Sequence, residues 1–120
     1  MRCRLEGIIG DEDIKECYRS AERFALQTDP LTGIMDMSEV TSFAVSAKTI
    51  QELATSAPAM PNPERLRILI APSPQTFGIA RMFEMIGQDK RPELHVVRSE
   101  KEALAILGIQ ETSFETIQLK

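Results

Sequence analysis

The stretch from Arg65 to Gly87 constrains the fold more than any other part of the chain. It begins with an apolar run over residues 66–71, whose centre Ile68-Leu69-Ile70 is apolar at consecutive positions, as in strands buried inside a parallel sheet. Ser73 followed by Pro74 is typical of a helix N-terminus, with serine as the cap and proline in the first turn. The stretch therefore predicts a buried strand that leads directly into a helix.

The predicted helix from Pro74 to Ile86 is apolar around more of its circumference than one sheet face can cover. Only Arg81 and Glu84 clearly require water. The apolar surface that the sheet does not cover predicts a partner: a second subunit, an apolar ligand or a lipid surface. The alternative is a helix that is buried between the sheet and another helix. The residues expected at this ligand site or interface are Phe77, Met82, Phe83, Met85 and Ile86.

The rest of the chain alternates strand and helix patterns. Arg2–Ile9 alternates polar and apolar residues, which predicts a strand at or near a sheet edge. The later elements are a helix from Asp11 to about Thr28 with Asp11 as its N-cap, a strand Leu31–Met37, a connection Ser38–Phe43, a helix Val45–Ala57 with Ser42 or Ser46 as its cap, a strand Glu93–Arg98 and a helix Glu100–Leu107 capped by Ser99. This order predicts an α/β fold with helices on a largely parallel sheet. Residues 1–109 are expected to form one domain, and 110–120 a tail that is a strand, a docked arm or disordered.

Charge and cysteine content limit the function classes. The chain of 120 residues has 14 Lys and Arg against 18 Asp and Glu, and a net charge of −4 without a basic cluster excludes typical nucleic-acid binding. No apolar run is long enough for a signal sequence or a membrane span, so we expect a cytoplasmic protein. Cys3 and Cys17 are too few for a disulfide framework; they are buried hydrophobes or, alternatively, a redox pair.

The sequence shows no catalytic or metal motif. Asp11-Glu12-Asp13 is explained as an exposed helix start, and a metal site is the alternative. His95 is the only histidine, and no serine or cysteine has a spacing that would pair it as a nucleophile. We therefore predict a protein that is not an enzyme and holds no metal or cofactor; a small hydrolase or transferase built around His95 is the alternative.

Several segments resemble the STAS domains, the sulphate-transporter and anti-sigma-factor-antagonist family. Gly33–Phe43 is similar to a STAS strand and loop. Ile70–Ser73 with Phe77–Met85 resembles the SpoIIAA-like branch of bacterial proteins, and Val96–Arg98 with Glu102–Leu107 is similar to its closing strand and helix. The resemblance implies a four- or five-stranded mixed sheet with about four helices, in which the first strand is an antiparallel edge strand.

The resemblance also implies a function. Regulatory STAS proteins carry a phosphorylatable serine where the second long helix begins, where a phosphate meets free N–H groups. Ser46 is the first candidate here and Ser42 the second, although the preceding acid and following glycine of the family pattern are missing. The SpoIIAA-like branch in turn resembles CRAL-TRIO lipid-transfer domains, which implies a lipid-like ligand or a membrane surface. We therefore expect a non-enzymatic regulatory or binding module, with a regulatory protein partner or a homodimer as further expectations.

Overall fold

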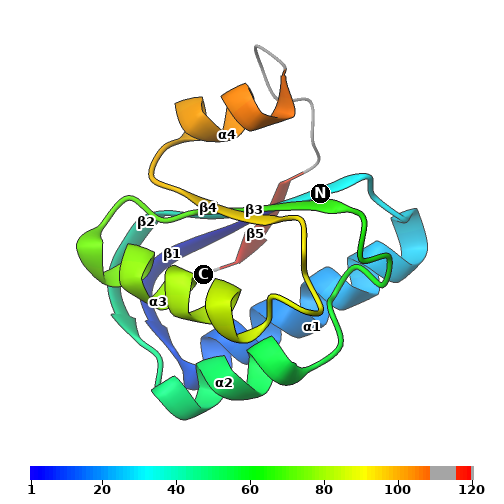
Figure 1. The fold of residues 1–120 in the computed structure, drawn as a ribbon. Helices are drawn as coiled ribbons and strands as arrows, with labels where there is room; N and C mark the ends of the chain where they lie inside the picture. The colour runs from blue at the N-terminus through cyan, green and yellow to red at the C-terminus, as the bar shows by residue number, and fades with distance from the viewer. Residues whose placement is uncertain (109–115, 120) are drawn as a thin grey trace.

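The computed structural model describes residues 1–108 in full and residues 116–119 by their backbone. Strands and helices alternate along the chain, and Figure 1 shows them arranged as a sheet between helices. The elements are β1 (Arg2–Gly10), α1 (Asp11–Thr28), β2 (Thr32–Ala44), α2 (Ala47–Thr55), β3 (Leu66–Ile70), α3 (Pro74–Ile86), β4 (Leu94–Val97), α4 (Glu100–Leu107) and β5 (Thr116–Leu119).

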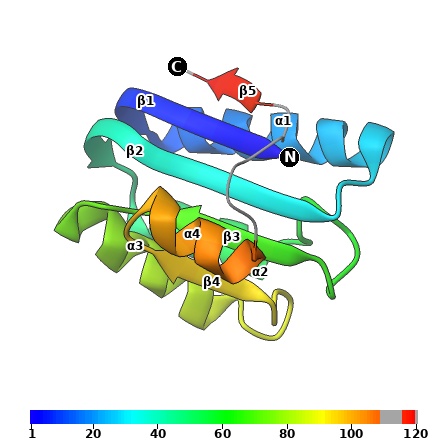
Figure 2. The same ribbon diagram turned by 90° about the horizontal axis from the view of Figure 1, so that it is seen from above.

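Every strand pairing in the sheet is parallel, and the strand order is β4-β3-β2-β1-β5. From β1 to β4 each crossover moves the chain one strand in the same direction, and α1, α2 and α3 all lie on one face (Figure 1). This is the arrangement expected when crossovers share one handedness. The next helix, α4, lies on the opposite face over β3 and β4 (Figure 2). The predicted α/β class with four helices on a sheet is confirmed.

The predicted antiparallel edge strand is wrong. β1 is parallel to β2, since the α1 crossover returns the chain to the same end of the sheet. The alternation in β1 has another cause: Cys3, Leu5 and Ile9 are buried with the residues of α1, whereas Arg2 and Arg4 face the side of α4. No helix of the described part covers β1 on that side (Figure 2). β1 therefore has one apolar and one polar face because the described helices cover only one of its two sides.

The second strand is longer than predicted. The sequence predicts a strand ending at Met37 and a connection from Ser38 to Phe43, but β2 runs on to Ala44 because β1 pairs with it as far as Gly10 opposite Ala44. The bounds of α2 shrink accordingly, from the predicted 45–57 to 47–55. Val40, Thr41 and Phe43 are good strand residues, so the signal was present but interrupted by polar neighbours.

Three predicted helix caps are confirmed. The Ser46, Ser73 and Ser99 hydroxyls accept hydrogen bonds from the backbone N–H groups of Thr49, Thr76 and Glu102, at 3.2, 3.1 and 3.2 Å. Asp11 was expected to cap α1, but it is the first residue of that helix, which follows Gly10. The cap that the sequence assigned to Asp11 is replaced by Asp13, whose carboxylate accepts the N–H of Gly10 at 2.9 Å.

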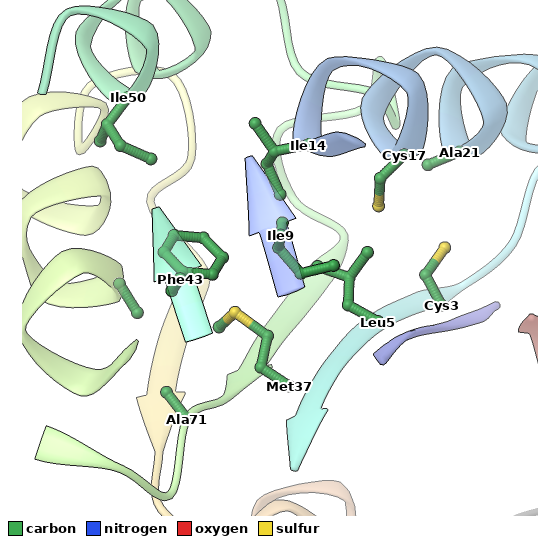
Figure 3. Packing of buried hydrophobic residues seen from close by; sticks show 11 residues of the cluster. Cys3, Leu5, Ile9, Ile14, Cys17, Ala21, Met37, Phe43, Ile50 and Ala71 are labelled. Carbon is green, nitrogen blue, oxygen red and sulfur yellow. The ribbon is translucent and has the colours of Figure 1, made fainter. Parts of the chain in front are cut away.

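Two hydrophobic clusters hold the layers together. The cluster on the side of α1–α3 is larger, and Figure 3 shows its side chains converging from helices and strands. The smaller one joins Ala103 of α4 to Ile68, Ile70 and neighbouring strand residues. Of the predicted tail, residues 110–115 and 120 lie outside the described residues, while the backbone of 116–119 runs parallel to β1 as β5.

Candidate functional site

An apolar cavity of about 70 Å³ lies between the sheet and the three helices that cover one face. The side chains around it come from α1, β2, α2, β3 and α3. Figure 3 shows four of them: Ile14 of α1, Met37 and Phe43 of β2, and Ile50 of α2. The other lining residues are Tyr18, Met35, Leu53, Leu69, Thr76, Ile79, Ala80 and Phe83. Protein interiors contain few voids larger than a water molecule, so a lined cavity here is a candidate binding site.

A second cavity of about 110 Å³ adjoins the first. Both are lined by Tyr18, Met35, Leu69 and Phe83, so these four side chains form the boundary between them. We call the two cavities together the helix-side cleft. The second cavity lies toward the starts of β3 and β4, where Arg67 and Leu94 line it. The remaining lining residues of the second cavity are Met1, Cys3, Ala21, Gly33, Ile34, Ala59, Met60, Ile68 and Arg91.

Arg67 is a buried cation in the wall of the second cavity, with 7% of its surface exposed. Its guanidinium donates to four backbone carbonyls: Nη2 to Met60 O at 2.6 Å and Asn62 O at 2.9 Å, and Nη1 to Arg65 O at 2.8 Å and Pro63 O at 3.3 Å. These bonds fix the proline-rich loop that leads into β3. Carbonyl dipoles satisfy the N–H groups but do not neutralise the charge.

Arg91 is the second buried cation in the same wall, with 4% exposed. It donates from Nη1 to Ala54 O at 2.8 Å and from Nη2 to the Tyr18 hydroxyl at 3.1 Å. Nη2 also lies within hydrogen-bond distance of Leu53 O and Ser56 O, at 3.1 and 3.2 Å. Its guanidinium carbon lies 4.8 Å from the centre of the Phe83 ring, close enough for a cation–π interaction. Arg91 thus joins the end of α2, the side chain of Tyr18 and the ring of Phe83.

These two arginines repel one another electrostatically. Burial lowers the pKa of Arg67, and the nearby charge of Arg91 lowers it further. The ion pairs among the described residues involve neither Arg67 nor Arg91. Burial also raises the pKa of Tyr18, against the opposing effect of Arg91, so the phenol stays protonated and donates to Ala57 O. The second cavity therefore combines apolar walls with two positive charges.

The structure separates the apolar residues that the sequence grouped on α3. Phe83 lines both cavities. Phe77 and Met82 are partly buried against the larger core cluster, and the Phe77 ring carries the guanidinium of Arg98 at 4.0 Å. Met85 and Ile86 point outward, with 69% and 38% exposed. An apolar helix circumference alone could not tell which of its sides faces a cavity.

Ser46 lies exposed at the start of α2, and the carboxylate of Asp11 accepts from its N–H at 2.7 Å and its hydroxyl at 3.1 Å. These bonds lower the pKa of Asp11, chiefly through the Ser46 backbone N–H. An acid therefore already occupies the N-terminus of α2, although it comes from a distant part of the chain. Ser42 lies exposed in β2. Phosphorylation at either serine stays a prediction.

His95 lies on β4 with nearly half of its side chain exposed, and its Nε2 is 3.8 Å from a carboxylate oxygen of Glu93. No group of three acidic, histidine or cysteine residues within 1–108 is placed to hold a metal ion. Cys3 and Cys17 are both buried as free thiols, and Figure 3 shows their sulfur atoms directed toward one another. A hydrogen bond with Cys3 and burial both raise the pKa of Cys17, which keeps it a thiol.

Sequence reasoning missed the polar residues of the helix-side cleft. Arg67 interrupts the apolar run that becomes β3, and a charged residue inside a buried strand was a usable signal. Arg91 lies among polar residues after α3, and Tyr18 lies among the apolar positions of α1, so neither residue stands out in the sequence. Their convergence comes from tertiary structure, since Arg91 meets a tyrosine 73 positions away.

Within the described residues, no helix combines the length and apolar character needed to cross a membrane. No protein-family model, curated protein or solved structure matches this chain.

Proposed function

We propose that this protein is a non-enzymatic binding module that takes an apolar ligand into the helix-side cleft. The observation that supports the proposal is the pair of adjoining cavities, of about 70 and 110 Å³, whose walls are almost entirely apolar side chains. An engineered apolar cavity of about 150 Å³ binds benzene. Because the space is divided into two adjoining cavities that share four lining residues, a flexible acyl chain can occupy both more readily than a rigid ring can.

The methionines of the cleft favour an adaptable site. Met35 and Met37 line the first cavity, and Met35 and Met60 line the second. Thioether side chains are unbranched and flexible, so they can rearrange around ligands of different length. We also propose, from the resemblance, that the protein is a SpoIIAA-like regulatory module of bacteria. The resemblance implies an antiparallel edge strand, but every strand pairing is parallel. The support for a binding function is therefore the helix-side cleft and not the resemblance.

Isothermal titration calorimetry with decanol tests this function. Ala80 is buried on α3 and lines the first cavity, so Ala80→Leu places three additional carbons there. We expect the wild-type protein to bind decanol and the variant to bind it at least about tenfold more weakly. The leucine occupies space in which the ligand would otherwise bury methylene groups, and each buried methylene contributes roughly 0.8 kcal/mol to the binding free energy. The matched control is Ala105→Leu, the same change at an exposed position of α4, which should leave binding unchanged. Absence of decanol binding to the wild type would contradict the proposal.

A phosphorylation switch of the anti-sigma-factor-antagonist type at Ser46 is the second candidate. The exposed hydroxyl at the start of α2 favours it. The Asp11 carboxylate 3.1 Å from that hydroxyl opposes it, because a phosphate there would meet a like charge. Incubation with a bacterial extract and ATP, followed by mass spectrometry of wild type, Ser46→Ala and Ser42→Ala, tests the switch; label on neither serine would end it.

A homodimer or a membrane surface would use the outward side of α3, where Met85 and Ile86 are exposed. Single exposed apolar side chains are common on monomers, so this stays a prediction. Native mass spectrometry of wild type and Met85→Glu distinguishes the cases. A dimer that the variant dissociates would support self-association through α3, and a monomer in both would exclude it.

A further inference from the structure

We propose that the ligand of the helix-side cleft is an anionic amphiphile, specifically a single-chain carboxylate, whose head group is bound by Arg67 and Arg91. The inference rests on the proposed function, because it names the class of molecule that the same cleft accepts. It follows from the charges in the wall of the second cavity, which an apolar ligand alone does not require.

The charge balance of this cavity is the first step. Arg67 and Arg91 are 7% and 4% exposed, both line the cavity, and no carboxylate of the described residues forms an ion pair with either of them. A buried ion is costly unless an opposite charge compensates it. By contrast, the buried Arg2 on the other face of the sheet has Asp36 at 2.6 Å. The cavity of Arg67 and Arg91 therefore favours an anion from outside the chain.

The available hydrogen-bond donors are the second step. Each terminal nitrogen of a guanidinium carries two N–H groups. For Nη1 of Arg91 the structure gives one acceptor among the described residues, Ala54 O at 2.8 Å. The other N–H of this nitrogen has no acceptor among the described residues, so a carboxylate bound in the cavity is a candidate acceptor, while the bonds to the end of α2 hold the guanidinium in the cavity wall. Charge-assisted bonds of this kind are about twice as strong as neutral ones.

The orientation of the ligand follows from the order of the two cavities. The arginines lie in the second cavity, near the starts of β3 and β4. The first cavity, which contains Phe43 and Thr76, lies beyond the shared side chains Leu69 and Phe83. A carboxylate at the arginines thus directs its acyl chain past these shared residues into the apolar first cavity.

The two arginines also have structural roles, since they hold the loop before β3 and the end of α2. The negative end of the α2 dipole offsets part of the charge of Arg91. Among the described residues, the acceptors of Arg67 are carbonyls of the loop at residues 60–65 and not of a helix C-terminus. The structural roles therefore leave the positive charge of the cavity in excess.

A calorimetric series with three ligands of equal chain length tests the inference on the wild-type protein. We titrate decanoate, decanol and decyltrimethylammonium at about pH 8, where a carboxylic acid is ionised. The expected result is that decanoate binds at least about tenfold tighter than decanol, and the cation weakest, since charged hydrogen bonds exceed neutral ones by that margin. Equal affinity for decanoate and decanol would overturn the inference while leaving the proposed function intact. Binding of none of the three would contradict the proposed function itself.

Variants assign the preference to the arginines. Arg67→Gln and Arg91→Gln should each remove most of the preference for decanoate over decanol, whereas Arg23→Gln, on the exposed side of α1, should retain it. The preference is the ratio of the decanoate and decanol affinities within each protein, so a change in the shape of the cleft that weakens both ligands alike leaves it unaltered. A preference for decanoate that survives both cleft variants would overturn the assignment. If a variant does not fold, the ligand series on the wild type still decides.

Discussion

Asp36→Asn should destabilise the protein strongly, because Asp36 belongs to a buried ion pair on the α4 side of the sheet. Its Oδ2 lies 2.6 Å from Nη2 of Arg2, and both side chains are about 5% exposed. Its other oxygen accepts the N–H of Ser38 at 2.9 Å. Arg2 also reaches Glu100 of α4 at 2.5 Å, so the pair connects β1, β2 and α4. The asparagine keeps the size of the side chain and removes only the charge.

The expected loss of unfolding free energy is about 3 kcal/mol. Removing one partner of a buried pair costs about 3–5 kcal/mol, and the lower end applies because Glu100 still neutralises part of the charge of Arg2. With an m-value of about 1.5 kcal/mol per M of urea for a domain of this size, the midpoint of urea unfolding should fall by about 2 M. Far-UV circular dichroism during urea titration measures this shift.

The matched control is Glu84→Gln, which removes the same charge from the ion pair with Arg81 on α3, where Arg81 is half exposed. Exposed pairs contribute about 0.2–1 kcal/mol, so this variant should shift the midpoint by no more than about 0.7 M. If Asp36→Asn costs no more than Glu84→Gln, the buried pair does not stabilise the sheet and the reasoning fails.

Three further predictions concern other parts of the fold. In Gly87→Ala the new methyl carbon would lie 2.8 Å from Nη1 of Arg91 and 2.9 Å from Ala54 O. We therefore expect the free energy of unfolding, measured in urea, to fall by about 1–3 kcal/mol. An unchanged urea midpoint would show that the neighbouring atoms move aside without cost. Burial alone would raise the pKa of Asp36, but the hydrogen bonds from Ser38 and Arg2 outweigh burial and lower that pKa. Because the folded protein binds this proton less readily than the unfolded chain, the free energy of unfolding should decrease as pH falls below about 4. This decrease should be smaller in Asp36→Asn. Cys17 should react with a thiol reagent at least about a hundredfold more slowly in the native protein than in urea, and equal rates would mean that α1 opens readily.

Local signals in the sequence predict most of the helices and the central strand correctly. Ser73 before Pro74 gives the start of α3, and the consecutive apolar residues at 68–70 give the buried strand β3. These predictions succeed because capping and strand burial depend on neighbouring residues. The antiparallel direction expected for β1 came from the resemblance, and the alternation in its sequence is equally compatible with a parallel strand that has one covered face.

The site was predictable only in part. Phe83 was expected at an apolar ligand site and lines both cavities, but Met85 on the same helix is exposed, because the direction of each side chain depends on how α3 packs. The approach of Arg67 and Arg91 depends on the loop before β3 and the turn after α3 meeting beside the sheet. Such contacts between distant segments leave no spacing pattern in the sequence.

The central claim is that the helix-side cleft binds an acyl chain, and methyl NMR of the protein labelled with ¹³C at methionine methyl groups tests it most directly. Met35, Met37 and Met60 line the cleft, whereas Met85 is exposed on the outer side of α3. Titration with decanol should shift the signals of the three cleft methionines in a saturable manner and leave that of Met85 in place. A shift of the Met85 signal alone, or of none, would contradict the account.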